Sequence, residues 1–334
     1  MRQRLSEIGW RTAIVLLVPS TFTTTRAAAQ DQPLNAAALF LLFPVGATTV
    51  GMGQTAAAAD GHGEVVFQNP AGVASLSSSE FALHTATLAA GPTNALTAFF
   101  PRHGIGVFGA TLYLADYGDL ELTDSSGTTN GRLSSRNFAF LATFATQLTG
   151  SVSLGVSYKL VQFAVTCSGA CQSVPAGQGV THALDVGGQF AVGADHALRI
   201  GVALRNVGFP LQVNNRDQAD PLPTRLTFGA TYRLQLRPVD DSVADRFDLR
   251  MAADVDSPWR QTGNPDIRLG VDVGYREMVR VRGGYAFVHQ GLSGPSIGLG
   301  VATGAIGVDL ARMFLTGTDL VTPNPTFLSF RVQF

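Results

Sequence analysis

From about Glu80 to the end of the chain, apolar and polar residues alternate with a period of two. In the segment RLTFGATYRLQLR, every even position from Leu226 to Leu236 is apolar, whereas most odd positions carry Arg, Thr or Gln. This alternation is typical of a β-strand whose two faces meet different surroundings. About fourteen segments follow the pattern, and they begin near residues 80, 93, 104, 134, 151, 180, 196, 223, 246, 266, 278, 295, 305 and 326.

The connections between these segments alternate in length. Those after the second, fourth, sixth, tenth and twelfth segments are tight, and most others are long and rich in Gly, Pro, Asn, Asp or Ser, at 116–131, 166–179, 208–222 and 316–325. An even strand number with short turns on one side is typical of a bacterial membrane barrel. We therefore predict an all-β fold, a transmembrane antiparallel β-barrel of about 14 strands over residues 80–334.

Composition supports this class. Charged residues make up 14% and apolar residues 46% of the chain, yet no apolar stretch reaches the roughly 20 residues that a membrane-spanning helix needs. The formal net charge of -1 argues against nucleic acid as a partner. Lys159 is the single lysine beside many arginines, which we interpret as genome bias.

Residues 1–29 have the features of a secretory signal peptide. Arg2, Arg4 and Arg11 precede the apolar run TAIVLLVPS, and the sequence AAAQ offers a cleavage site after Ala29. Export to an oxidising compartment predicts that the only two cysteines, Cys167 and Cys171, form a small disulfide. A metal site is the alternative, which the absence of a nearby pair of histidines disfavours.

Charged residues on the polar face of the strands would point into the barrel lumen. They are Arg225, Arg233, Arg250, Asp254, Arg268, Asp272, Arg280 and Arg282. These residues would either line a substrate path or pair with one another, and the energetic cost of an unpaired buried charge favours pairing. No Ser, His and Asp set, paired carboxylates or metal-ligand cluster stands out among residues of matching facing. We therefore predict that the protein is not an enzyme and needs no cofactor and no metal.

Residues 30–79 lack the alternation. They contain an apolar segment of about ten residues, a Gly-rich turn, an Ala-rich stretch and then EVVFQNPAGVASL. Ten residues are too few to span a bilayer as a helix, and an apolar segment of this kind is not stable in water. The barrel lumen is the nearest place to bury it.

The last strand predicts how the barrel is assembled. In FLSFRVQF, the residues Leu328, Phe330, Val332 and Phe334 form one apolar face. The segment resembles the closing strand of bacterial outer-membrane proteins, whose terminal Phe is recognised by the barrel-insertion machinery. The resemblance implies that Phe334 is the insertion signal and that this machinery is a partner.

The stretch PVGATTVGMGQTAAAADGHGEVVFQNPAG, from Pro44 to Gly72, resembles the N-terminal signature of the PorV/PorQ family, relatives of the FadL-type outer-membrane transporters. The resemblance implies that residues 30–79 form a hatch that plugs the barrel. It also implies that the motif Asn69, Pro70, Ala71 and Gly72 packs near a distorted third strand, where Gly104, Gly106 and Gly109 would allow a kink.

Pro70 fixes one backbone dihedral and Asn69 can cap or turn the chain, so on this hypothesis the motif is a rigid corner that directs the hatch toward the barrel wall. An ordinary turn between the hatch and the first strand is the alternative.

The resemblance implies two functions. The first is passive uptake of small hydrophobic molecules through a barrel with a hatch-gated lateral path. The alternative is an accessory or shuttle role in type IX protein secretion, with a cargo signal domain bound at the outer loops. Purely structural anchoring is a third interpretation. In each case we expect a monomer in the Gram-negative outer membrane, in contact with its lipid.

The alternation and the terminal aromatic residue predict a heat-modifiable protein of the outer-membrane fraction. Unboiled protein should migrate faster on gels than boiled protein, because a closed barrel stays folded in detergent. Deletion of Phe334 should reduce the amount of folded barrel. Identical migration with and without boiling, or recovery of the protein in the soluble fraction, would contradict the barrel.

Overall fold

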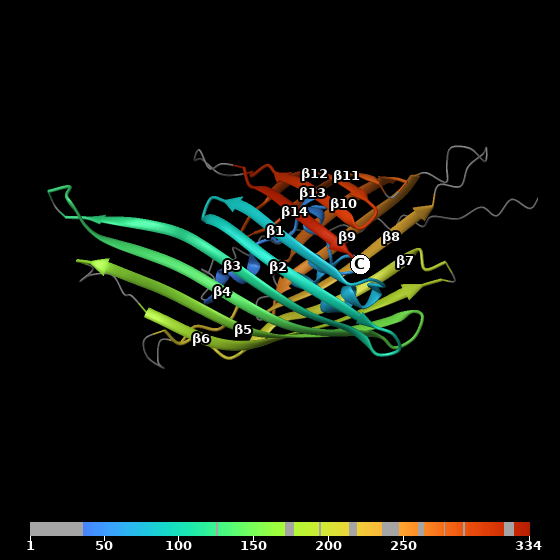
Figure 1. Cartoon of the computed structure of the whole chain (residues 1–334), viewed down its shortest axis with the longest axis horizontal. Helices are drawn as coiled ribbons and strands as arrows, with labels where there is room; N and C mark the ends of the chain where they lie inside the picture. The colour runs from blue at the N-terminus through green and yellow to red at the C-terminus, as the bar shows by residue number, and fades with distance from the viewer. Residues whose placement is uncertain are drawn as a thin grey trace, which may run out of the picture. The chain divides into compact units, whose positions relative to one another are not determined.

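The chain folds as a closed antiparallel barrel of fourteen strands, in which each strand pairs with the next and β14 pairs with β1 (Figure 1). The computed structural model describes residues 36–334 except 125, 171–176, 194, 214–218, 236–246, 260–263, 277, 290 and 317–323. The predicted signal peptide lies outside the described residues. Among the residues described, no helix is long and apolar enough to cross a membrane. The predicted all-β barrel of fourteen strands is confirmed.

The strands begin within a few residues of their predicted starts. They are β1 (Glu80–Leu88), β2 (Gly91–Arg102), β3 (Gly106–Thr123), β4 (Thr129–Gln147), β5 (Val152–Gly169), β6 (Gly177–Val192), β7 (Leu198–Gly208), β8 (Arg225–Gln235), β9 (Phe247–Pro258), β10 (Asp266–Tyr275), β11 (Val279–Phe287), β12 (Gly294–Thr303), β13 (Ile306–Met313) and β14 (Thr326–Gln333).

The connection predicted at 116–131 is wrong, because most of it is strand. β3 continues to Thr123 and β4 begins at Thr129. The polar ends of these strands are joined by cross-strand ion pairs, between Arg132 and Asp119 at 3.5 Å and between Arg136 and Asp116 at 3.2 Å. Because of these polar ends, β3, β4 and β5 extend well beyond the strands from β10 to β14 (Figure 1). The strands therefore continue beyond the point where the apolar alternation stops.

The two faces of the wall differ as the alternation predicts. On β12, Ile297, Leu299 and Val301 point outward and are about half exposed, at 56%, 50% and 50%. Ser296 on the same strand is 3% exposed and faces the interior. Large apolar residues are exposed at outward positions of every strand except β4, where the outward Phe138, Phe140 and Phe144 are partly buried. An exposed apolar surface of this extent requires apolar surroundings.

The interior of the barrel holds the N-terminal segment, residues 36–79, which forms the short helices η1 (Leu39–Leu42), α1 (Ala47–Gly51), η2 (Gly63–Phe67) and η3 (Pro70–Ser75) (Figure 1). Its backbone amides bind inward side chains of the wall. Ala47 N donates to Ser329 Oγ at 2.9 Å, and Ala56 N donates to Asp254 Oδ2 at 2.8 Å. The apolar stretch is thus buried inside the barrel, as its short length predicts.

Glycines of the wall leave room for the backbone of the N-terminal segment. A side chain at Gly187 of β6 would collide with the Asn69 carboxamide, and one at Gly201 of β7 would collide with the Ala57 carbonyl oxygen. The same holds at inward positions of β5, β10 and β11, at Gly155, Gly270 and Gly284. An isolated glycine within a strand often marks the close approach of another backbone. This signal was present in the sequence, although our sequence analysis did not use it.

The glycine contacts predict that Gly187→Val displaces the N-terminal segment and leaves the barrel closed. The added side chain would occupy the position of the Asn69 carboxamide, whereas the strand ladder is independent of the segment. We expect faster hydrogen exchange in peptides from residues 63–75 and unchanged heat-modifiable migration. Gly188→Val is the matched control, because a Cβ at Gly188 makes only ordinary contacts at 3.4 Å or more. Equal exchange rates in the two variants would contradict the prediction.

Candidate functional site

The predicted motif is the N-terminal cap of η3. Asn69 is fully buried, and its Oδ1 accepts a hydrogen bond from Ala71 N at 3.0 Å. Pro70 occupies the first helical position, where its missing N–H group leaves no donor unsatisfied. The Asn69 Nδ2 donates to the Ala57 carbonyl oxygen at 2.6 Å. Asn69 therefore joins the two halves of the N-terminal segment as well as starting η3.

The motif lies against β5 and β6 rather than against a kink in the third strand. The backbone of Pro70 and Ala71 packs on Gly155 of β5, and Asn69 packs on Gly187 of β6. Asn69 Nδ2 also lies 3.3 Å from the carbonyl oxygen of Gly188. Hydrogen bonds and glycine contacts thus place the motif two strands further along the wall than the resemblance implied.

The register shifts of β3 lie at other positions than the three predicted glycines. Gly104 lies in the turn before β3, and Gly106 begins the strand with a φ of 143°. From Val107 to Asp116 the strand pairs with β4 without a register shift. The register shifts occur later, between Asp116 and Asp119 and between Leu122 and Thr123. Gly109 is instead a packing position, because the ring of Phe99 covers it.

A bulge in β7 was not predicted. Leu184 of β6 pairs with Val207, but Val186 pairs with Leu204, so β7 has one extra residue opposite Asp185. As a result two consecutive side chains, Arg205 and Asn206, are both buried, at 3% and 0% exposure. Bulges re-aim side chains in this way, and Asn206 adopts the left-handed φ of 57° that Asn tolerates well.

Lys159 of β5 holds the bulge. Its ammonium group lies 2.7 Å from Asp185 Oδ2 and donates to Asn206 Oδ1 at 2.6 Å. Asp185 Oδ1 in turn accepts from the Asn206 backbone amide at 2.7 Å. The side chains therefore satisfy backbone and charged groups that the interrupted ladder leaves free. The only lysine of the chain has a specific structural position, which genome bias does not explain.

One cluster of the predicted lumen charges is centred on Asp256 of β9. Its Oδ2 lies 3.4 Å from Arg205, 3.1 Å from Arg225 and 2.9 Å from Arg268. Arg225 also pairs with Asp266. Asp256 and Asp266 were absent from the predicted set.

The remaining predicted charges also have partners among the described residues. Asp254 accepts from Ala56 N and Ala57 N rather than from an arginine. The other pairs are Arg280 with Asp272 and Asp248, Arg282 with Asp309 and Asp272, Arg250 with Asp248, and Arg233 with Asp60. The predicted lumen charges are thus paired within the protein, which is the alternative that the energetic cost of an unpaired buried charge favours.

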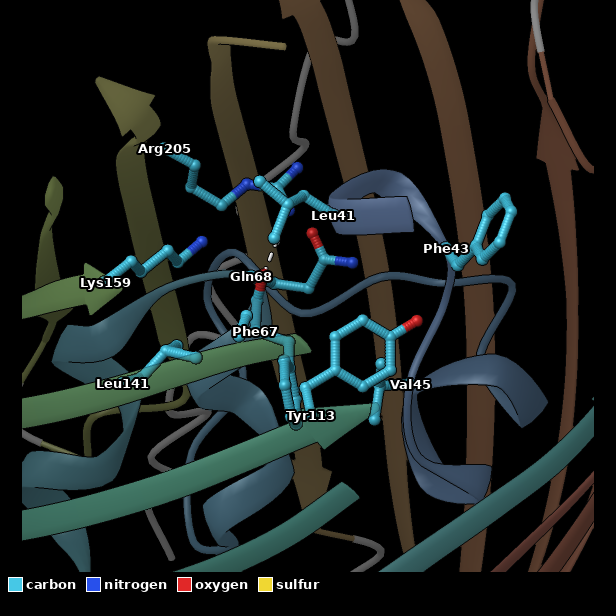
Figure 2. Close-up of a pocket in the computed structure, with 10 residues that line it drawn as sticks. Leu41, Phe43, Val45, Phe67, Gln68, Tyr113, Leu141, Lys159 and Arg205 are labelled. Carbon is cyan, nitrogen blue, oxygen red and sulfur yellow. Dashed lines mark hydrogen bonds between the residues drawn. The ribbon is translucent and has the colours of Figure 1, made fainter. Parts of the chain in front are cut away.

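A small pocket lies between the N-terminal segment and the wall strands β3, β4, β5 and β7 (Figure 2). Its free volume is about 10 Å³, which is room for roughly one water molecule. The lining combines apolar and aromatic side chains with a few polar ones, as small-molecule sites do. The lining residues are Leu41, Phe43, Val45, Phe67, Gln68, Tyr113, Ala139, Leu141, Lys159 and Arg205.

Two contacts attach the N-terminal segment at this pocket. Arg205 NH1 donates to the Phe67 carbonyl oxygen at 3.0 Å, and the Tyr113 hydroxyl donates to the Phe40 carbonyl oxygen at 3.3 Å. Tyr113 also stacks on Phe40, with ring centroids 5.8 Å apart. Arg205 faces inward like Gly201 and Ala203 in the regular register between β7 and β8, so it reaches both the segment and the pocket. The bulge adds Asn206 beside it.

Glu64 is the main titratable group of the N-terminal segment. It accepts from Thr49 N at 2.5 Å and from Thr49 Oγ1 at 2.9 Å, which ties η2 to α1. His84 of β1 lies 3.7 Å away, and Ser329 of β14 donates to it at 3.5 Å. Burial, assisted by the nearby Asp309 carboxylate, raises the pKa of Glu64 to about 7.

The disulfide of Cys167 and Cys171 and the role of Phe334 as an insertion signal stay predictions. Cys167 lies in β5, but Cys171 lies outside the described residues, so the disulfide stays a prediction. Phe334 stacks on Phe81 at 5.7 Å and exchanges backbone hydrogen bonds with Ser79, next to the β1–β14 closure. Within the described part of the chain, no group of three or more His, Cys, Asp or Glu residues could hold a metal ion.

No protein-family model and no curated protein matches the sequence. Solved structures do match. The Ralstonia pickettii toluene transporter TbuX aligns with a TM-score of 0.62 at 15% identity, over 86% of this chain and 98% of that chain. The toluene transporter TodX of P. putida gives 0.58 at 13%, over 90% and 99%. A Pseudomonas aeruginosa FadL homologue gives 0.53 at 11%, over 87% and 98%. The chain thus shares the fold of FadL/TodX-type barrels.

The raised pKa of Glu64 predicts a pH-dependent attachment of the N-terminal segment. The folded pKa of about 7 exceeds the ordinary value of 4.5, so the folded state binds more protons between these two pH values. The free energy of unfolding of the segment should therefore fall as pH rises from about 4.5 to 7, by about 3 kcal/mol as an upper bound. Hydrogen exchange of residues 47–67 at pH 4.5 and pH 8 measures this change.

The matched variant is Glu64→Gln, which keeps an acceptor for Thr49 and removes the titration. Comparison of the variant with the wild type at equal pH cancels the intrinsic pH dependence of exchange. It also cancels the opposite contribution of His62, because burial lowers the pKa of His62 well below 6.5 in both proteins. The variant should protect the segment better than the wild type at pH 8 and equally at pH 4.5. The same difference at both pH values would show that the Glu64 charge is not responsible.

Proposed function

We propose that this chain is an outer-membrane barrel for the passive uptake of small hydrophobic molecules, with the N-terminal segment as its hatch. The observation that carries the proposal is a closed barrel, apolar outside, whose interior holds a separately attached segment beside an aromatic-lined pocket. The shared fold supports it, because two of the similar structures are described as toluene transporters.

The outer face supports a position in the membrane. In a bilayer every backbone polar group of the wall needs an internal partner, which a closed barrel supplies. The outward apolar residues would then contact the lipid, and the paired charges would face the lumen. Because membrane barrels of this type occur in outer membranes, we propose the Gram-negative outer membrane as the location of the folded chain.

A hatch role follows from how the N-terminal segment is attached. The barrel strands pair with one another without it, so the segment can shift while the wall stays closed. The free volume of about 10 Å³ is too small for an aromatic hydrocarbon, so passage requires such a shift. A passing molecule would have to break hydrogen bonds between the wall and the segment, such as those that Tyr113 and Arg205 donate to it.

The pairing of β3 with β4 from Val107 to Asp116, which has no register shift, gives no support for a lateral path there. We place such a path instead at the β7 bulge, where the ladder is interrupted beside the pocket. Membership of the PorV/PorQ family and a role in type IX secretion rest on the motif from Pro44 to Gly72, and no contact among the described residues favours them over uptake.

The test is uptake of radiolabelled toluene by cells that express the chain. Expression should raise the initial rate, and Ala139→Phe should lower it several-fold, because Ala139 is buried in the pocket wall. Ala142→Phe on the outward face of the same strand is the control and should leave uptake unchanged at equal amounts of folded barrel.

Toluene uptake that is the same with and without the protein would refute the proposal. Mass spectrometry of material that copurifies in mild detergent then separates the alternatives. A lipid-like ligand supports uptake, whereas a cargo signal domain without any toluene uptake supports the secretion role.

A further inference from the structure

Two buried polar atoms in the pocket have no hydrogen-bond partner among the described residues. They are Oε1 of Gln68 and Nε of Arg205. The two residues are 7% and 3% exposed, and both line the pocket. In Figure 2 the Gln68 carboxamide lies between Leu41 and Tyr113, and the Arg205 guanidinium ends beside Leu41, where it binds the Phe67 carbonyl oxygen. Buried polar atoms are nearly always paired, so this arrangement points to a ligand group.

The two charged side chains of the pocket have partners. Arg205 NH1 binds the Phe67 carbonyl oxygen, and Arg205 NH2 lies 3.4 Å from Asp256. The ammonium group of Lys159 is held by Asp185 and Asn206. Both cations of the pocket therefore already have a carboxylate partner. The unpartnered buried atoms that remain are one acceptor and one donor.

This pair of atoms discriminates between chemical groups. A hydroxyl group both donates and accepts, so it can bind Gln68 Oε1 and Arg205 Nε together. A carboxylate has no proton to donate to Gln68 Oε1 and would leave this buried acceptor unpaired. An ammonium group cannot accept from Arg205. A hydrocarbon satisfies neither atom and leaves both desolvated, which is unfavourable.

We propose that the pocket binds an uncharged hydroxyl-bearing ring compound of the phenol class, with its hydroxyl group between Gln68 and Arg205. The aromatic side chains Phe43, Phe67 and Tyr113 would pack against the ring. The ring needs more room than the free volume offers, so it displaces the part of the N-terminal segment around Leu41. The inference rests on the proposed function in that it names the substrate class that the same pocket selects.

Binding in lipid nanodiscs tests the site directly. The dissociation constants of phenol, toluene and benzoate are measured at pH 7 by saturation-transfer NMR, with empty nanodiscs as the baseline. Phenol should bind about tenfold more tightly than toluene or benzoate, because only its hydroxyl group satisfies both atoms. Gln68→Leu should weaken phenol binding about tenfold and leave toluene binding unchanged.

The matched control is Gln147→Leu, the same substitution at an exposed position at the end of β4. This variant should bind all three compounds as the wild type does. If Gln68→Leu gives no heat-modifiable barrel, Gln68→Met replaces it, since it also removes the acceptor and keeps the side-chain length. Equal affinity of the wild type for phenol and toluene, or a loss that affects both compounds alike, overturns the inference.

Uptake of radiolabelled phenol and toluene separates this inference from the proposed function. If phenol binding depends on Gln68 but neither compound enters faster than in cells without the protein, the uptake proposal fails and the binding site stands. If both compounds enter faster but Gln68→Leu leaves the phenol rate and the phenol affinity unchanged, uptake stands and the hydroxyl site is refuted.

Discussion

The closed ladder of backbone hydrogen bonds is the constraint on which the rest of this structure depends. A wall with an apolar outer face cannot leave N–H and C=O groups unpaired toward apolar surroundings. Pairing of β1 with β14, from Glu80 opposite Gln333 to Thr87 opposite Thr326, removes both free edges. Because the closure does not use the N-terminal segment, the interior can hold a separate element whose attachment differs from that of the wall.

The interior satisfies a different requirement, since it must pack a folded segment and neutralise many charges in a small space. Glycines at inward positions, such as Gly187 and Gly201, leave room for the backbone of the segment. Asp256 forms ion pairs with three arginines, and Asp254 accepts hydrogen bonds from two backbone amides of the segment. The segment is therefore held by discrete polar contacts and close packing, which can break without opening the wall.

The β7 bulge links the wall to the pocket. One extra residue opposite Asp185 turns Asn206 inward beside Arg205, and Lys159 stabilises this arrangement. Arg205 then contacts the N-terminal segment and lines the pocket at the same time. A local change in strand register thus determines which polar groups a molecule inside the barrel would meet.

The sequence by itself determined the strands, their number and the inward or outward facing of their residues, because a period of two is a local property of the chain. It also determined that the apolar stretch before Glu80 has to be buried. The tertiary structure decided that Asn69 packs on β5 and β6, that β3 keeps its register with β4 through Gly109, and that Lys159 holds a bulge. These features depend on contacts between residues far apart in the chain. The period of two tells which face a residue takes, but it does not tell which distant residue it meets there.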